Sequence, residues 1–180
     1  ASTRDDAAGE AFDKVARVIG LPYPGGAAMD KLAYEGNPRA IALPSPALSG
    51  DTLDFSFSGL KTATLNYINS TRQKGEEPDH ADVTASYTRV IVDAIVKKTE
   101  EALRLTQSKS LVLAGGVAAN SHLRASLEQM CKKEHVTLSV PPRSLCGDNA
   151  AMIGAQSYFD YMSGKLADSS LNASAQDSIV

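Results

Sequence analysis

The amino-acid sequence predicts an α/β fold in which a mostly helical first two-thirds joins a small strand–turn–helix unit. Apolar residues recur at helical spacing in several segments before residue 107. After that point, two short apolar runs at 111–114 and 136–140 alternate with helical patterns, as strands and helices do in βαβ units. The apolar content is 43% of 180 residues, which is enough for a buried core.

Helices are predicted where apolar residues recur every three to four positions between start and stop signals. The expected ranges are about 7–19, 27–34, 59–72, 80–105 and 150–162, and another helix carries Leu123, Leu127, Met130 and Cys131 on its inner side. The acidic pair Asp5 and Asp6 stands just ahead of the first helix, and negative charge is favourable at a helix start.

The other segments are expected to be loops or short extended pieces. Residues 38–52 are rich in Pro, Ser and Gly, and 54–57 alternates polar and aromatic residues, which fits a strand end or a packed turn. We expect three parts in this chain: a helical region at 1–109, a nucleotide-binding unit at 110–165 and a flexible tail at 166–180.

A strand, a glycine turn and a helix start follow one another at Leu111 to Asn120. Gly115 and Gly116 end the apolar run, and such a turn lets a phosphate or ribose approach bare backbone N–H groups. Asn120 stands where the helix begins, so its amide could bind a ribose or phosphate or could simply cap the helix.

A second small turn, Cys146-Gly147-Asp148-Asn149, leads into an Ala-rich helix. Asp148 there could cap the helix or face outward and hold a cation. The two turns together suggest a nucleotide-and-metal site, and the alternative is two ordinary helix starts of an α/β protein.

Composition excludes several classes of protein. The net charge is −3 and the Lys and Arg residues are scattered, so no basic stripe marks a self-sufficient nucleic-acid binder. The two cysteines lack CxxC spacing, which favours a reducing compartment, and no apolar run approaches the length of a membrane span. With no signal peptide evident, we expect a cytoplasmic protein.

Five motifs in order resemble one family over roughly residues 3–165, namely the tRNA N6-adenosine threonylcarbamoyltransferases (bacterial TsaD, formerly Gcp or O-sialoglycoprotein endopeptidase). The motifs are the run from Thr3 to Lys14, Tyr23-Pro24-Gly25-Gly26, the run from Leu53 to Thr62, Gly115 to Asn120 and Cys146 to Ile153. The resemblance implies an actin-like ATPase (ASKHA, ribonuclease-H-like) fold, of which this chain is most of the second lobe with a helical insertion.

The resemblance also implies the site and the reaction. The family moves a threonylcarbamoyl group from threonylcarbamoyl-AMP to N6 of the adenosine next to the tRNA anticodon. Positions matching Asp13, Gly26, Asp30 and Asn120 line the adenylate site, with the glycine turn beside them. Asp148 matches a ligand of one divalent metal, iron or zinc, whose other ligands are two histidines upstream of this chain. The chain is therefore expected to be the C-terminal half of a larger protein.

The family's partners are tRNA, an inactive paralogue (TsaB-like) and a small P-loop ATPase (TsaE-like), and ATP or ADP is a further possible ligand. His80, His122 and His135 do not stand at ligand spacing, so we expect them to be surface or capping residues and the chain alone to be inactive. The older peptidase label is not supported, because the chain has neither an HExxH pair nor a catalytic triad. Two alternatives remain: the nucleotide-binding lobe of an ASKHA kinase relative, and a protein-interaction module.

Overall fold

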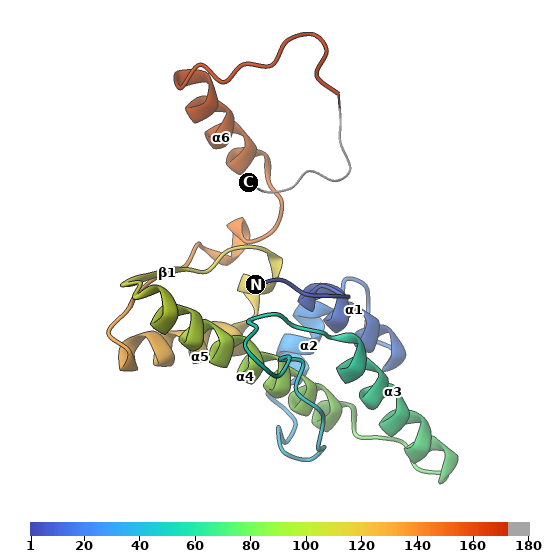
Figure 1. Ribbon diagram of the computed structural model, residues 1–180. Helices are drawn as coiled ribbons and strands as arrows, with labels where there is room; N and C mark the ends of the chain where they lie inside the picture. Colours follow the sequence, from blue (N-terminus) through green and yellow to red (C-terminus); the bar gives the residue numbers. More distant parts are fainter. Residues whose placement is uncertain (173–180) are drawn as a thin grey trace. The chain divides into compact units, whose positions relative to one another are not determined.

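The structure is a computed structural model that describes residues 1–172 (Figure 1). Residues up to Cys146 form one compact part and the segment from Gly147 forms a second. The first part contains α1 (Ala8–Val18), α2 (Gly26–Leu32), α3 (Ser58–Gln73), α4 (His80–Thr106), β1 (Ser110–Val112), η1 (Gly116–Ala119), α5 (Ser121–Lys133), β2 (Thr137–Ser139) and η2 (Arg143–Leu145). The second part contains α6 (Ala150–Met162).

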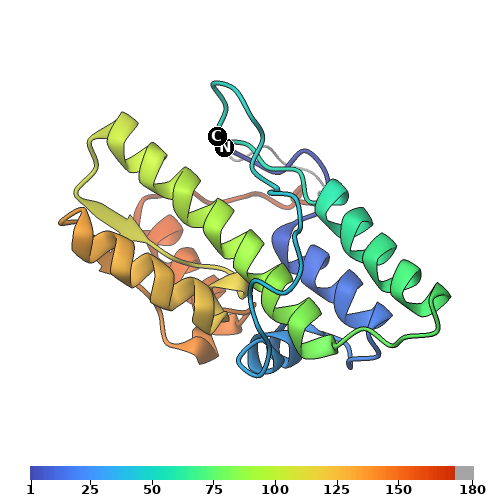
Figure 2. The ribbon, with the colours of Figure 1, turned by 90° about the horizontal axis from the view of Figure 1, so that it is seen from below.

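Helix α4 is the central element of the first part, and Figure 2 shows it between the α1 and α3 side and α5. It is 27 residues long and buries side chains on several sides. Tyr87, Val90 and Ile91 pack with α1, α2 and α3, whereas Val92 packs with α5. Val83 contributes to a third cluster, with Ile19, Ile41 and Ile68. Burial on several sides explains why no single narrow apolar stripe runs along this helix.

The two strands form a parallel pair in which Leu111 lies opposite Leu138. Both leucines pack against the apolar side of α5, which connects the strands as a βαβ crossover. On the other face Val112 is 70% exposed. The strands are shorter than the predicted runs: β1 ends at Val112 and β2 at Ser139. Leu113 donates one more hydrogen bond to the Ser139 carbonyl, and the chain turns at Gly115.

Asp5 and Asp6 precede helix α1, which begins at Ala8. The carboxylate of Asp5 accepts hydrogen bonds from the start of α3 rather than from α1. Of the two forms predicted for residues 54–57, the structure has no regular strand there: Phe55 makes only isolated bridges, with Thr3 and Ala47. The remaining predicted helices are confirmed, with ends within three residues of those expected.

The C-terminal segment is described by itself. Helix α6 is apolar, and none of its side chains is buried. Residues 173–180 of the predicted tail lie outside the described residues, and the predicted division at 109 and 110 stays a prediction. Among the described residues, no helix combines the length and apolarity that crossing a membrane requires.

Candidate functional site

Asp13 lies half-buried on α1 and reaches the beginning of α2. Its Oδ1 accepts a hydrogen bond from the N–H of Gly25 at 2.7 Å. A carboxylate at this place satisfies a backbone donor that a helix start leaves unpaired. Gly26 is the first residue of α2, and a Cβ built on it meets nothing within 4 Å. The space above Gly26 is therefore open to an approaching ligand.

The glycine turn connects β1 to α5 through a short 3-10 turn that the sequence did not predict. Gly115 has φ +89°, a conformation that favours glycine, and both Gly115 and Gly116 are exposed. The turn residues Gly116–Ala119 precede Asn120, which is buried. Exposed backbone at the end of a strand is the arrangement that the phosphate-binding interpretation requires.

Asn120 is the N-cap of α5. Its Oδ1 accepts the N–H of Leu123 at 2.8 Å, which is the capping role that the sequence left open. The cap uses the carbonyl of the amide and not its NH₂ group. A capping role and a ligand contact therefore do not exclude one another at this residue.

Asp30 lies on α2 and also reaches the start of α5. Its Oδ1 accepts hydrogen bonds from the N–H of Ser121 at 2.8 Å and from the Ser121 hydroxyl at 3.0 Å. Both bonds go to one oxygen. The carboxylate thus joins two helices that are 91 residues apart in the sequence.

Tyr34 and His122 extend this connection, although no role was predicted for Tyr34 from the sequence. The Tyr34 hydroxyl lies 2.8 Å from Ser121 Oγ, and its ring stacks on His122 with ring centres 4.0 Å apart. The Nε2 of His122 lies 3.2 Å from the backbone carbonyl of Asp30. Spacing could have suggested these residues, because Tyr34 follows Asp30 by one helical turn and His122 follows Asn120 directly after Ser121.

Arg124 on α5 fixes the turns on either side of this site. Its Nε donates to the carbonyl of Ala118, and its Nη2 donates to the carbonyl of Pro141 at 2.9 Å and contacts Cys146 Sγ at 3.0 Å. One guanidinium thus holds both the glycine turn and the segment after β2. A single arginine within a helical pattern carries no sequence signal for such a role.

Asp148 belongs to the second part of the structure, where it is exposed. The cap of α6 is Asn149, whose Oδ1 accepts the N–H of Met152 at 3.0 Å, so Asp148 is not the capping residue. Among the described residues, no group of three His, Cys, Asp or Glu could hold a metal ion. The side chains described here therefore do not form a metal site by themselves.

The three histidines lie at the positions relative to helices and strands that were predicted from the sequence. His80 begins α4 directly after its cap Asp79, His122 lies in the first turn of α5, and His135 precedes β2. The imidazole of His122 has specific contacts and is more than a surface residue.

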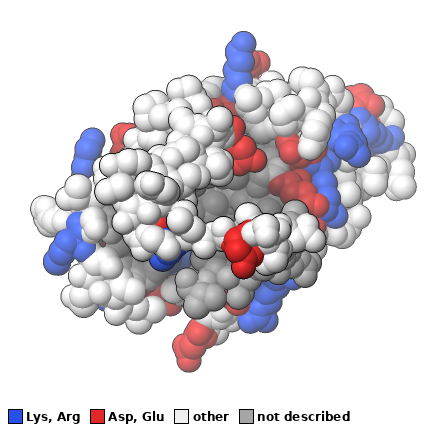
Figure 3. Space-filling model, turned by 90° about the horizontal axis from the view of Figure 1, so that it is seen from above, with Lys and Arg blue, Asp and Glu red and all other residues white. Residues whose placement is uncertain are grey.

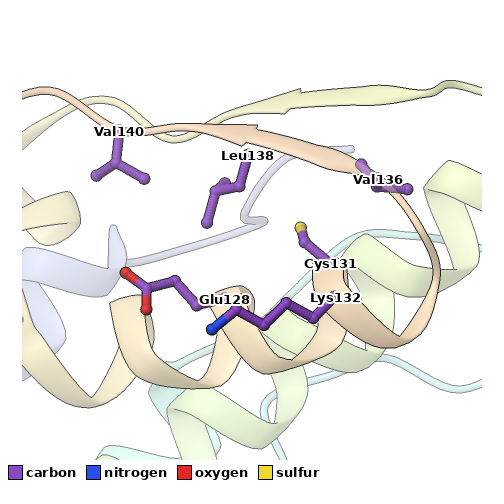
Figure 4. A pocket seen from close by; sticks show the side chains of 6 residues that line it. All are labelled: Glu128, Cys131, Lys132, Val136, Leu138 and Val140. Carbon is purple, nitrogen blue, oxygen red and sulfur yellow. The ribbon is translucent and has the colours of Figure 1, made fainter.

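A shallow hollow of about 420 Å³ lies away from these residues, between α5 and β2 (Figure 4). Leu138 and Cys131 point into it, and Glu128 and Lys132 lie along its α5 side. Burial raises the pKa of the Cys131 thiol, which lowers its reactivity as a nucleophile. The hollow contains none of the predicted site residues.

Charge on the surface is mixed. Figure 3 shows Lys and Arg interspersed with Asp and Glu on the face it presents, without one continuous basic area there. This agrees with the scattered charges of the sequence and its net charge of −3.

The sequence matches one known family of enzymes. The sequence model of the TsaD family, tRNA N6-adenosine threonylcarbamoyltransferase, matches residues 1–155. Enzymes with that name are 54% identical in Moorella thermoacetica over 172 residues and 53% identical in Desulfitobacterium hafniense over 171 residues. The matches cover 96% and 95% of this chain but 50% of each relative. The chain therefore spans about half the length of these relatives.

Among solved structures, the crystal structure of HypF from T. kodakarensis resembles this chain with a TM-score of 0.63. The match covers 90% of this chain and 21% of HypF at 20% sequence identity, so the likeness is one of fold. Together with the family match, it confirms the predicted actin-like ATPase (ASKHA) class of α/β fold.

Proposed function

Since the chain belongs to the tRNA N6-adenosine threonylcarbamoyltransferase family, we propose that it is the adenylate-binding half of a tRNA-modifying transferase. In this reaction, N6 of an adenosine attacks the carbamoyl carbon of threonylcarbamoyl-AMP. A C–N bond forms, the C–O bond to the phosphate breaks, AMP leaves and N6 loses a proton. The enzyme works in the cytoplasm.

One observation carries this proposal: the four residues that we assign to the adenylate lie at, or hydrogen-bond to, the starts of α2 and α5. Asp13 caps the chain entering α2, Gly26 leaves space above it, and Asp30 ties α2 to the helix that Asn120 caps. Helix N-termini and exposed turn glycines favour phosphate and ribose groups. In this proposal the four residues bind the adenylate and hold its acyl group in a fixed orientation for attack.

The ligands of the proposed metal ion are assigned only partly to this chain. Asp148 is one carboxylate of the kind that binds a divalent ion, and the described residues offer no complete ligand set. We therefore assign to Asp148 a single ligand position, with the histidine ligands supplied from outside this chain. Such an ion, iron or zinc, would polarise the carbonyl of the threonylcarbamoyl group when bound.

The partners follow from the same reasoning. tRNA binding needs more basic surface than this chain offers, so other parts of the enzyme and its partners, a TsaB-like paralogue and a TsaE-like ATPase, supply it. ATP or ADP would occupy the adenylate site as a competing ligand.

Calorimetric titration of the chain with a non-hydrolysable threonylcarbamoyl-adenylate analogue tests the proposal. We expect micromolar binding that does not change when divalent metal is added, and weaker binding for Asp13→Ala than for the surface control Asp93→Ala. Absence of binding would contradict an adenylate site on this chain. Transfer to tRNA by the chain with its partners, without the histidines, would overturn the assignment of the metal ligands.

A further inference from the structure

We propose that the exposed face of the Tyr34 ring is a stacking surface for a nucleobase. The inference deepens the proposed function, on which it rests. Tyr34 lies in the turn that follows α2, where it is 64% exposed. His122 covers one face of its ring, at an interplanar angle of 26°. The Tyr34–His122 pair is therefore two stacked rings to which a third aromatic ring can be added.

The orientation of the tyrosine ring is fixed by a chain of hydrogen bonds. Ser121 donates its single hydroxyl proton to Asp30, so the Tyr34 hydroxyl is the donor to Ser121 Oγ. The ring is thus held at its hydroxyl and at one face before any ligand arrives. Little side-chain entropy remains to be lost on binding.

The histidine ring is held as firmly. The carbonyl oxygen of Asp30 can only accept a hydrogen bond, so His122 carries its proton on Nε2 in this contact. The same residue therefore positions both rings, Tyr34 through its carboxylate and Ser121, and His122 through its backbone carbonyl.

The surroundings of the pair favour a nucleobase over an apolar partner. Tyr34 belongs to none of the three apolar clusters; its hydroxyl contacts the Ser121 hydroxyl, which in turn donates to the Asp30 carboxylate. An aliphatic partner would desolvate these groups without replacing their hydrogen bonds. A base stacks through its π-face and keeps polar edges for such neighbours.

Two sources of the base share this chemistry: the adenine of the adenylate, and a base of the tRNA anticodon loop. The Tyr34–His122 pair lies near the proposed adenylate site, because His122 is in the first turn of the helix that Asn120 caps. Either base could therefore stack on Tyr34.

Binding of AMP to the chain, and of an anticodon stem-loop RNA to the complete enzyme with its partners, measured separately, tests the inference. We expect Tyr34→Leu to weaken binding of one of these ligands about 5- to 150-fold, the range for loss of one base stack. Tyr34→Phe keeps the ring and should retain most of the affinity. Tyr158→Leu is the matched control, because Tyr158 is 60% exposed and meets Phe159 edge-on.

The ligand that loses affinity identifies the source of the base. Unchanged affinity of Tyr34→Leu for both ligands would overturn the inference, and so would an equal loss in Tyr34→Phe. Thermal unfolding monitored by circular dichroism must show the variants folded. Transfer to tRNA, assayed in the complete enzyme, tests the proposed function separately. If the wild type transfers the group but Tyr34→Leu leaves both affinities unchanged, the stacking surface is refuted and the proposed function stands.

Discussion

The Asp30 carboxylate holds the first residue of α5 by accepting both the backbone N–H and the hydroxyl of Ser121, at 2.8 and 3.0 Å. This contact fixes α2 against α5 and so sets the separation of Gly26 from Asn120. A side chain expected to touch the ligand thus also holds together the two helices of the proposed site.

Replacing Asp30 should therefore cost stability as well as affinity. We expect Asp30→Ala to lower the free energy of unfolding by about 1 kcal/mol, as loss of a helix cap does, and Asp30→Asn to cost less because an amide oxygen can still accept. Urea unfolding measures both. The control Asp93→Ala removes an exposed ion pair with Arg89 and should change stability by less than about 0.5 kcal/mol. A wild-type midpoint for Asp30→Ala would contradict the capping role.

Gly25 and Gly26 should respond in opposite ways to alanine. A Cβ on Gly25 would lie 2.1 Å from the Cβ of Ala16, so Gly25→Ala should cost about 1–3 kcal/mol through overpacking of α1 on α2. A Cβ on Gly26 meets nothing, so Gly26→Ala should leave stability unchanged or slightly raised while weakening binding of the adenylate analogue. Thermal unfolding and calorimetry separate the two effects. Unimpaired binding by a folded Gly26→Ala variant would remove Gly26 from the site.

Asp5 should make the fold sensitive to acid. Desolvation alone would raise its pKa, but hydrogen bonds from the Ser56 and Ser58 hydroxyls and from the N–H groups of Phe57 and Ser58 lower it from 3.8 to about 2. Because the folded-state pKa is the lower one, this contribution is complete above pH 3.8 and is lost as pH falls through about 2.

We therefore expect Asp5→Asn to reduce stability at neutral pH and to flatten its loss on acidification. Ser58→Ala, which removes one donor, should give an intermediate curve. Denaturant unfolding at a series of pH values checks this, and parallel curves for the wild type and Asp5→Asn would refute it.

Tyr87 should remain protonated well into alkaline solution. Burial, and secondly the negative charge of Asp6, raise the pKa of its phenol, which donates to the carbonyl of Ala11 at 3.1 Å. A raised folded-state pKa stabilises the fold below the ordinary value of 10.0, and this contribution is lost as pH rises through the folded-state pKa.

Tyr87→Phe should consequently cost about 1 kcal/mol at neutral pH, for one buried hydrogen bond, and lessen the loss of stability at high pH. Absorbance of tyrosinate during alkaline titration, with Tyr158→Phe as control, measures the effect. Ionisation of Tyr87 near pH 10 without unfolding would contradict it.

The order and type of the helices could be predicted from sequence, because apolar periodicity and start signals such as Asp79 act over a few residues. The same local reasoning assigned Asp5 to the start of α1, which its carboxylate does not cap. Its carboxylate has a better set of donors at Ser56 to Ser58, more than fifty residues away, and spacing along the chain cannot reveal them.

The sequence by itself determined the family, through five motifs in order, and with it the residues to consider: Asp13, Gly26, Asp30, Asn120 and Asp148. Only the tertiary structure decided what holds them. It joined Asp30 to Ser121, stacked Tyr34 on His122 and made Arg124 the link between two turns. The physical reason is that motifs record residue types at short range, whereas a hydrogen bond or a ring stack between distant segments exists only after packing around α4 has brought them together.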